Sequence, residues 1–504
     1  MQYISTRGLE SSFSFSDILF EGYAEDGGLY VPAVFPKVDA HTLMTWRGLS
    51  YASLAFEVIR LFAEELPKED LWQICSEAYQ AGNFGHTRGM FTAEEITPVK
   101  WLHDQVGLLE LSNGPTLAFD DIAMQFMSRL FDTSFAQGRP RTLLGATTGD
   151  MGAAAEAAFG GHKNIKVVML SPKDRMSQFQ AAQLYSNQDP NVVNIEVNGT
   201  FDECQDIVRT ILEDREYAKA HGLGAQTGVK KVFGDKAIAA RLAERNIRLS
   251  SANSINWGRL VPQIVYYFYG YLRAVERVGE EVVFAVPGGN FGNAYACWVA
   301  KKMGLPIMRL IVCTNENDAM DEFLRTGRYA PKPSSETIAT SSPSTDISRA
   351  ASFERFLFDV LGRDGTRVRE LAEDLKTKGE FTLTAEEFRK VRLSGVVSGS
   401  SNHPNRLEII EQMHLEYDTY VDPHTADALF SGIYLHPVGV KTLCVETVQA
   451  VKFPRMVRQA TGVAVEPPED MADLFSRPLR KVQTPACEAA VREEIERLTE
   501  RPDA

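Results

Sequence analysis

The sequence lacks several features that define specialised classes of protein. Its six cysteines are widely spaced and form no CxxC pair, which argues against a zinc site or a disulfide framework and fits a reducing compartment. No apolar run approaches ~18 residues, so no membrane span is expected. The formal charge of −14 disfavours nucleic acid or an anionic membrane as the main partner. The first residues show no signal-peptide pattern, and we expect a cytoplasmic protein.

What is present fits a globular α/β protein. A chain of 504 residues is too long for one ordinary core, so two or three domains are expected. Short apolar runs at Leu108–Leu111, Val167–Leu170 and Val282–Val286 indicate buried strands. Residues 50–82 and Ile264–Leu272 have helical character instead. Strands that alternate with helices predict a parallel sheet whose two faces are covered.

Two stretches are unusually polar. Residues 330–346 are rich in Pro, Ser and Thr, which fits either a surface loop or a loop that faces a substrate. Residues 213–250 carry many charges, among them Lys230, Lys231 and Lys236. We expect this second stretch to be a solvated helical insertion, with a partner surface as the alternative.

A glycine-rich segment is a candidate anion site. Gly288-Gly-Asn-Phe-Gly-Asn293 follows a predicted strand and precedes a predicted helix. Glycines at such a turn let backbone N–H groups approach an anion, and the N-terminus of a helix favours negative charge. The pattern therefore indicates a phosphate site, although a tight turn without a ligand has the same sequence appearance.

Residues 112–121 read Ser-Asn-Gly-Pro-Thr-Leu-Ala-Phe-Asp-Asp. They resemble the cofactor-lysine motif of the threonine synthases, His-Gly-Pro-Thr-x-Ala-Phe-Lys-Asp. Further segments resemble that family in the family's own order: Ser5-Thr-Arg-Gly8, Asp26-Gly-Gly-Leu-Tyr-Val-Pro32, Phe201-Asp-Glu-Cys-Gln205, Asn253-Ser-Ile-Asn-Trp-Gly-Arg259, Thr314-Asn-Glu-Asn-Asp318, Ser342-Pro-Ser-Thr-Asp-Ile347 and Asp422-Pro-His-Thr-Ala426. The resemblance therefore extends over nearly the whole chain.

The resemblance implies a fold and a division into domains. The fold is that of the pyridoxal phosphate (PLP) enzymes of fold type II, the tryptophan synthase β type, with two parallel-sheet lobes around the cofactor. We expect an N-terminal helical unit at 1–92 and a large α/β lobe from 93–140 and 256–480. A small α/β lobe with the charged insertion is expected at 141–255, and a C-terminal helix at 481–504. The expected partner is an amino-acid or phosphorylated small-molecule substrate, with the chain as a monomer or homodimer.

The resemblance also implies site residues. The PLP phosphate would be held by Gly288, Gly289, Asn290, Phe291, Gly292 and Asn293, and Thr447 would face the pyridine nitrogen. The residues implied at the substrate are Asn113, Thr147, Thr148, Asp150, Met151, Asn256 and Arg259. Arg259 suits a bidentate contact with a substrate phosphate, while an ion pair with a carboxylate between helices would explain it equally well. His424 is a candidate acid/base group or a hydrogen-bonded structural histidine.

The departures from the family pattern are concentrated where the family keeps its chemistry. Asp120 stands at the position of the lysine that holds PLP as an imine, and a carboxylate forms no Schiff base. PLP is therefore not expected as a lysine-bound imine. Losing the lysine's proton transfers alone costs on the order of 10²–10⁴ in rate. Asp120 is still a candidate general base, because burial beside a ligand raises the pKa of a carboxyl.

Other positions change together with it. Asn113 and Gln449 replace histidines, Met151 and Thr345 replace a threonine and a methionine, and Glu446 replaces a serine of the family pattern. Lys100 and Lys452 are candidates for a substitute lysine, although a structural or surface role is the more common one for such residues.

Three functions follow from these observations. The first is an enzyme repurposed for a non-standard elimination or replacement on an amino-acid derivative, a lyase of the threonine synthase type with Asp120 in the lysine's place. The second is a non-catalytic pseudoenzyme that binds PLP, an amino acid or a partner protein. The third is a working or inactivated threonine synthase that converts O-phosphohomoserine to threonine.

Overall fold

Two parallel sheets dominate the computed structural model, which describes residues 1–132, 141–214, 217 and 249–499. The six-stranded sheet has the order β13-β10-β9-β14-β4-β3, in which only the β3–β4 pair is antiparallel. Its strands are β3 (Val99–His103), β4 (Val106–Glu110), β9 (Val282–Pro287), β10 (Ile307–Thr314), β13 (Val396–Ser400) and β14 (Lys441–Glu446).

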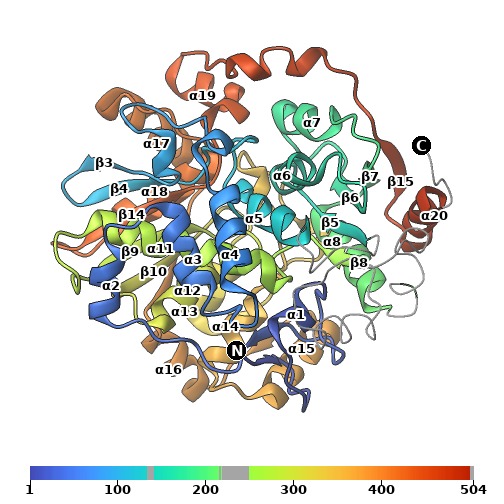
Figure 1. Ribbon diagram of the computed structural model, residues 1–504, viewed down its shortest axis with the longest axis horizontal. Coiled ribbons are helices and arrows are strands. Elements are labelled where there is room, and N and C mark those ends of the chain that lie inside the picture. The colour runs from blue at the N-terminus through green and yellow to red at the C-terminus, as the bar shows by residue number, and fades with distance from the viewer. Residues whose placement is uncertain (133–140, 215–216, 218–248, 500–504) are drawn as a thin grey trace.

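The second sheet has five strands in the order β15-β7-β6-β5-β8, and all of its pairs are parallel. Its strands are β5 (Arg141–Ala146), β6 (Ile165–Pro172), β7 (Val192–Asn198), β8 (Leu249–Ser251) and β15 (Val482–Pro485). The two sheets lie on opposite sides of the molecule in Figure 1, and α5 (Asp120–Asp132) and α6 (Asp150–Phe159) lie between them.

Helices cover both sheets. Those of the larger lobe are α11 (Trp257–Ala274), α12 (Gly292–Met303), α13 (Ala319–Thr326), α14 (Phe353–Val360), α15 (Gly365–Lys378), α16 (Ala385–Leu393), α17 (His403–Tyr417), α18 (Pro423–Leu435) and α19 (Pro454–Thr461). The smaller lobe has α6, α7 (Gln178–Tyr185), α8 (Phe201–Glu213) and α20 (Glu488–Thr499). Among the helices that the structure describes, none is long and apolar enough to cross a membrane.

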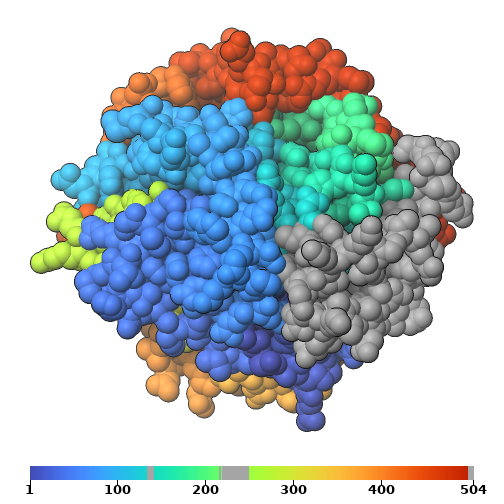
Figure 2. All heavy atoms as spheres, in the orientation of Figure 1, coloured from blue at the N-terminus to red at the C-terminus, as the bar shows by residue number. Residues whose placement is uncertain are grey.

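The N-terminal part is a layer of short helices on one face of the molecule. It contains the antiparallel strands β1 (Tyr3–Ser5) and β2 (Tyr30–Pro32) and the helices α1 (Phe15–Ile18), α2 (Ala40–Trp46), α3 (Tyr51–Ile59) and α4 (Lys68–Ala78). Figure 2 shows this segment in blue across the front of the molecule. α3 packs on α11, a helix that is apolar around most of its circumference and buried almost along its full length.

The predicted alternation of strands and helices is confirmed. The apolar runs at Val167–Leu170 and Val282–Val286 lie inside β6 and β9, and Ile264–Leu272 lies inside α11. The C-terminal segment, predicted as a helix, holds β15 as well as α20, because residues 482–485 pair with β7. Lys230, Lys231 and Lys236 of the predicted charged insertion lie outside the described residues.

Candidate active site

A cavity of about 130 Å³ lies where several helices of both lobes begin. Because the strands are parallel, the helices that follow them begin at the same edge of each sheet, the usual place for a ligand in α/β folds. α5, α6 and α12 each start with a residue of the cavity wall, so three helix N-termini favour negative charge there. Of the predicted site residues, the wall includes Asp120, Thr147, Thr148, Asp150, Met151, Arg259, Gly288, Gly289, Asn290, Gly292, Asn293, His424 and Thr447.

The loop before α12 has the geometry of an anion cradle. Gly289 and Phe291 adopt φ angles of +46° and +65°, and the capping residue Phe291 offers no side-chain acceptor to the first turn of the helix. A Cβ on Gly292 would lie 2.5 Å from that of Ser254, so only glycine fits there. The first backbone N–H groups of α12 are thus left for a ligand.

Asn293 adds a side-chain donor to this loop. Its Oδ1 accepts hydrogen bonds of 2.5 Å from both the Tyr266 and the Tyr267 hydroxyl. This fixes the amide so that Nδ2, which is buried, has no partner within the described part of the chain. The side-chain amide of Asn290, which also lies in the cavity wall, is engaged within the protein: Nδ2 donates to Gln205, and Oδ1 accepts the backbone N–H of Ala351.

Asp120 is the first residue of α5 and forms an ion pair with Arg259 of α11. Both side chains are buried, with exposures of 4% and 5%. Burial raises the pKa of Asp120, and the Arg259 guanidinium opposes that shift. The pair uses Oδ1 of Asp120, while Oδ2 has no hydrogen-bond partner among the residues described. The carboxylate is therefore held in place with one oxygen free at the cavity.

A second buried pair joins Asp150 to Lys452, with Nζ 2.8 Å from Oδ1. Gln180 and Ser344 donate to the other carboxylate oxygen at 2.7 and 2.9 Å. Burial alone would raise the pKa of Asp150, but the Lys452 ammonium, together with His424 and Ser344, outweighs it and the pKa is lowered. Lys452 is fully buried and does not line the cavity, and Lys100 lies on β3 and bonds Thr419. Both carboxylate oxygens of Asp150 thus have partners, whereas only one oxygen of Asp120 does.

Both ring nitrogens of His424 have partners. Nδ1 lies 2.7 Å from the Asp422 carboxylate, and Nε2 accepts the backbone N–H of Ser344 at 2.9 Å. Burial lowers the pKa of His424, but the carboxylates of Asp422, Asp150 and Asp427 together raise it by more, so the net direction is upward. A ring that accepts a hydrogen bond at Nε2 is nevertheless neutral in this arrangement, a tautomer that follows from its two partners.

Three predicted site residues lie outside the cavity wall. Asn113 donates to the backbone carbonyls of Ile96 and Glu110, and Asn256 caps α11 and bonds the carbonyl of Leu19. Phe291 packs in an aromatic cluster with Phe353. In each case the side chain makes its contacts within the protein. A sequence motif cannot reveal such contacts.

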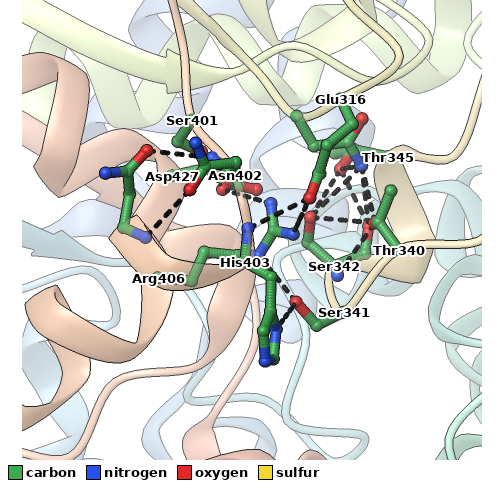
Figure 3. Close-up of polar contacts among 12 residues, drawn as sticks. Glu316, Thr340, Ser341, Ser342, Thr345, Ser401, Asn402, His403, Arg406 and Asp427 are labelled. Carbon is green, nitrogen blue, oxygen red and sulfur yellow. Dashed lines mark hydrogen bonds and ion pairs between the residues drawn. The ribbon is translucent and has the colours of Figure 1, made fainter.

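The polar stretch 330–346 contributes to the wall at its end, through Ser344 and Thr345. Figure 3 shows the network that anchors this end of the loop. Arg406, which is fully buried, donates to Ser341 and forms ion pairs with Glu316 and Asp427. Prediction from the sequence left two uses open for the stretch; its last residues face the cavity.

Glu446 directly precedes the cavity residue Thr447, and its pKa is shifted. Burial raises its pKa to about 7, and Arg88, whose guanidinium contacts both its carboxylate oxygens, opposes the shift. Glu110 lies opposite it on the neighbouring strand and 3.6 Å from the same guanidinium. Two buried carboxylates therefore share one arginine.

Comparison with known proteins identifies the family. The family "Threonine synthase N terminus" matches residues 2–79, and "Pyridoxal-phosphate dependent enzyme" matches residues 94–375. A threonine synthase of Methylobacillus glycogenes is 44% identical over 95% of this chain and 96% of its own length. A second relative, the threonine synthase of Corynebacterium glutamicum, is 41% identical over 98% of both chains. The chain belongs to the threonine synthase family.

Solved structures agree with this membership. The PLP-bound threonine synthase from Brucella melitensis covers 99% of this chain with a TM-score of 0.85 and 34% identity. The yeast threonine synthase gives a TM-score of 0.81 at 30% identity. The fold is thus PLP fold type II, as the motif resemblance implied.

The cavity of this threonine synthase relative fits one end of PLP and not the other. The uncapped first turn of α12 and the buried Nδ2 of Asn293 suit a phosphate. Thr447 lines the cavity, and no hydrogen bond to its hydroxyl occurs within the described ranges. At the aldehyde end, Asp120 offers a carboxylate where the family motif has an amine.

Proposed function

We propose that the cavity binds PLP, or a close chemical relative, without a covalent link, and that the chain uses it on an amino-acid derivative in an elimination or replacement of the threonine synthase type. The observation that supports this most is that the cavity has an anion cradle before α12 and also holds the Asp120–Arg259 pair, with Asp120 where the family motif has its lysine. When bound, the cofactor supplies an electron sink for a carbanion next to the substrate nitrogen.

The chain's own residues would bind the cofactor and orient the substrate. The α12 loop and Asn293 would hold the phosphate, and Thr447 would contact the ring nitrogen. Thr148 lines the cavity and its hydroxyl has no hydrogen-bond partner among the described residues, so it is available to a substrate carboxylate. Asp120 would take a proton from the substrate's Cα at Oδ2, while Arg259 keeps the carboxylate in position. Burial raises its pKa, which makes this carboxylate a stronger base than an exposed aspartate.

Two alternatives each have a specific observation in their favour. The names of the relatives favour ordinary threonine synthesis, in which O-phosphohomoserine and water give threonine and phosphate. The ion pairing of Asp120 and the double engagement of His424 favour a non-catalytic pseudoenzyme, because both candidate acid/base groups already have partners. Asp120 keeps one oxygen without a partner, which is why we favour an enzyme.

The first experiment is an absorbance titration of the purified chain with PLP, followed by borohydride reduction and peptide mass mapping. The proposal predicts saturable binding with the spectrum of the free aldehyde and no reduced adduct on Lys452 or Lys100. An adduct on either lysine would support a working threonine synthase with a substitute lysine. Absence of binding would overturn the proposed function.

Turnover separates the remaining alternatives. The chain, loaded with PLP, is incubated with O-phosphohomoserine and with other β- or γ-substituted amino acids, and phosphate, oxo acid and amino-acid products are measured. Product formed from another derivative but little threonine supports the repurposed enzyme. Binding without any product supports the pseudoenzyme instead.

A further inference from the structure

We propose that, while no substrate is bound, this cavity prefers a phosphate monoester that carries a primary ammonium group, with pyridoxamine phosphate as the ligand, over the aldehyde PLP. The inference rests on the proposed function in one respect, namely that the cavity binds a phosphorylated pyridine. It goes further by assigning Asp120 as the residue that decides which chemical form of that pyridine is held.

Charge complementarity is the first argument. In the family motif position 120 is a lysine, whose amine combines with the aldehyde carbon of PLP. Asp120 reverses the charge and the hydrogen-bonding character of that position, since a carboxylate only accepts hydrogen bonds while an ammonium only donates them. The complement of a carboxylate at this place is an ammonium on the ligand, joined by charge-assisted hydrogen bonds. An aldehyde oxygen would instead set one acceptor against another.

The free oxygen of Asp120 is the second argument. Two carboxylates line the cavity, those of Asp120 and Asp150. Asp150 receives Lys452 on Oδ1 and both Gln180 and Ser344 on Oδ2, so it has little capacity for a ligand. Asp120 is bonded through Oδ1 alone, and its Oδ2 has no partner in the described part of the structure. It is 3% exposed, so an unpaired oxygen there faces the cavity and not bulk water.

Arg259 makes the arrangement stable without a ligand. It neutralises Asp120 through one Nη2 contact, and its Nη1 donates to the carbonyl of Ala252. The guanidinium therefore stays fixed to the protein on two sides, and an ammonium can approach the other carboxylate oxygen without displacing it. The ligand's phosphate charge is met separately by the α12 N-terminus and Asn293.

The decisive comparison uses three ligands that differ at a single group. Pyridoxamine phosphate has an ammonium, pyridoxine phosphate a hydroxyl and PLP an aldehyde at the same carbon. Dissociation constants are measured by isothermal titration calorimetry on the full, unaltered chain. We expect pyridoxamine phosphate to bind at least about tenfold more tightly than pyridoxine phosphate. Equal affinities, or tighter binding of PLP, would overturn this inference and leave the proposed function intact.

Two variants assign the preference to Asp120. Asp120→Asn keeps the shape and removes the charge, and it should bring pyridoxamine and pyridoxine phosphates to within about twofold of each other. The variant Asn293→Ala should weaken all three ligands alike, because it removes a donor at the phosphate end. A preference that survives in Asp120→Asn would show that another group holds the amine, and would sink the inference. If none of the three ligands binds the unaltered chain, the proposed function itself fails.

Discussion

Asp120 and Arg259 come from α5 and α11 and form an ion pair in which both side chains are buried. The sequence alone located Asp120 through a motif, and it left two uses open for Arg259: a substrate phosphate or a carboxylate partner. The structure pairs Arg259 with Asp120, which are 139 positions apart in the chain. A contact between residues this far apart cannot be predicted from one sequence, because it depends on how α5 packs on α11.

Removing the arginine should leave a buried, uncompensated carboxylate. We expect Arg259→Met to lower the free energy of unfolding by about 3–5 kcal/mol, measured as a loss of thermal stability. As a control, Arg328→Met breaks surface pairs with Glu322 and Glu380 and should cost at most about 1 kcal/mol. Similar losses in the two variants would show that the buried Asp120–Arg259 pair contributes no more to stability than a surface pair.

Glu446 gives a prediction of pH dependence. Burial raises its pKa to about 7, so the folded chain keeps a proton that the unfolded chain releases at lower pH. Its contribution to stability is thus full below the unfolded pKa of about 4.5 and is lost as the pH rises toward 7. Glu446→Gln, which stays neutral, should therefore gain stability relative to the unaltered chain between about pH 5 and pH 8, by up to about 3 kcal/mol.

Thermal unfolding of both proteins across this pH range measures the difference. Glu373→Gln serves as the control for loss of one carboxylate from the surface. Parallel stability curves for the unaltered chain and Glu446→Gln would contradict the assignment of a shared buried charge to Arg88, Glu110 and Glu446.

At the scale of elements, the loop before α12 was predictable and its neighbours were not. Glycines between a strand and a helix indicate an anion site, and the structure gives that loop positive φ angles and an uncapped helix. Asn113 and Asn256 were assigned to substrate by their motif positions, yet their amides bond backbone carbonyls of other elements. Motifs record residue types, whereas the partners of a buried amide are set by packing.

Gly292 tests the cradle directly. Gly292→Ala places a Cβ 2.5 Å from that of Ser254 and should force the loop away from its present course. We expect a loss of about 1–3 kcal/mol in stability, together with at least about tenfold weaker binding of pyridine phosphates. Gly48→Ala is the matched control, since a Cβ there meets nothing within 4 Å. Unchanged ligand affinity in Gly292→Ala would contradict the phosphate site.

At the scale of the whole molecule, the C-terminal segment adds a strand to the smaller sheet. The apolar runs sufficed to predict the central strands, but β15 is short and mostly polar, and it becomes a strand only because β7 offers an open edge. Figure 1 shows this last segment, in red, crossing to the smaller lobe, where α20 packs on α8. Its contribution follows from tertiary contacts that local periodicity does not encode.

Ile495 of α20 measures that contribution. It is 1% exposed in a core cluster shared with α8, so Ile495→Ala should destabilise the protein by about 2–4 kcal/mol. Ile338→Ala, at a side chain that is 40% exposed, should cost well under about 1 kcal/mol. A thermal shift no larger for Ile495→Ala than for Ile338→Ala would show that the C-terminal segment adds little to the fold.

The central claim is that this member of the threonine synthase family keeps the cofactor pocket and lacks the covalent link. The most direct test is the intact mass of the unaltered chain and of Asp120→Lys after incubation with stoichiometric PLP and borohydride reduction, with peptide mapping. The account predicts a reduced adduct at position 120 in the variant and none in the pocket of the unaltered chain. An adduct on Lys452 of the unaltered chain, or no adduct at position 120 of a folded variant, would contradict it.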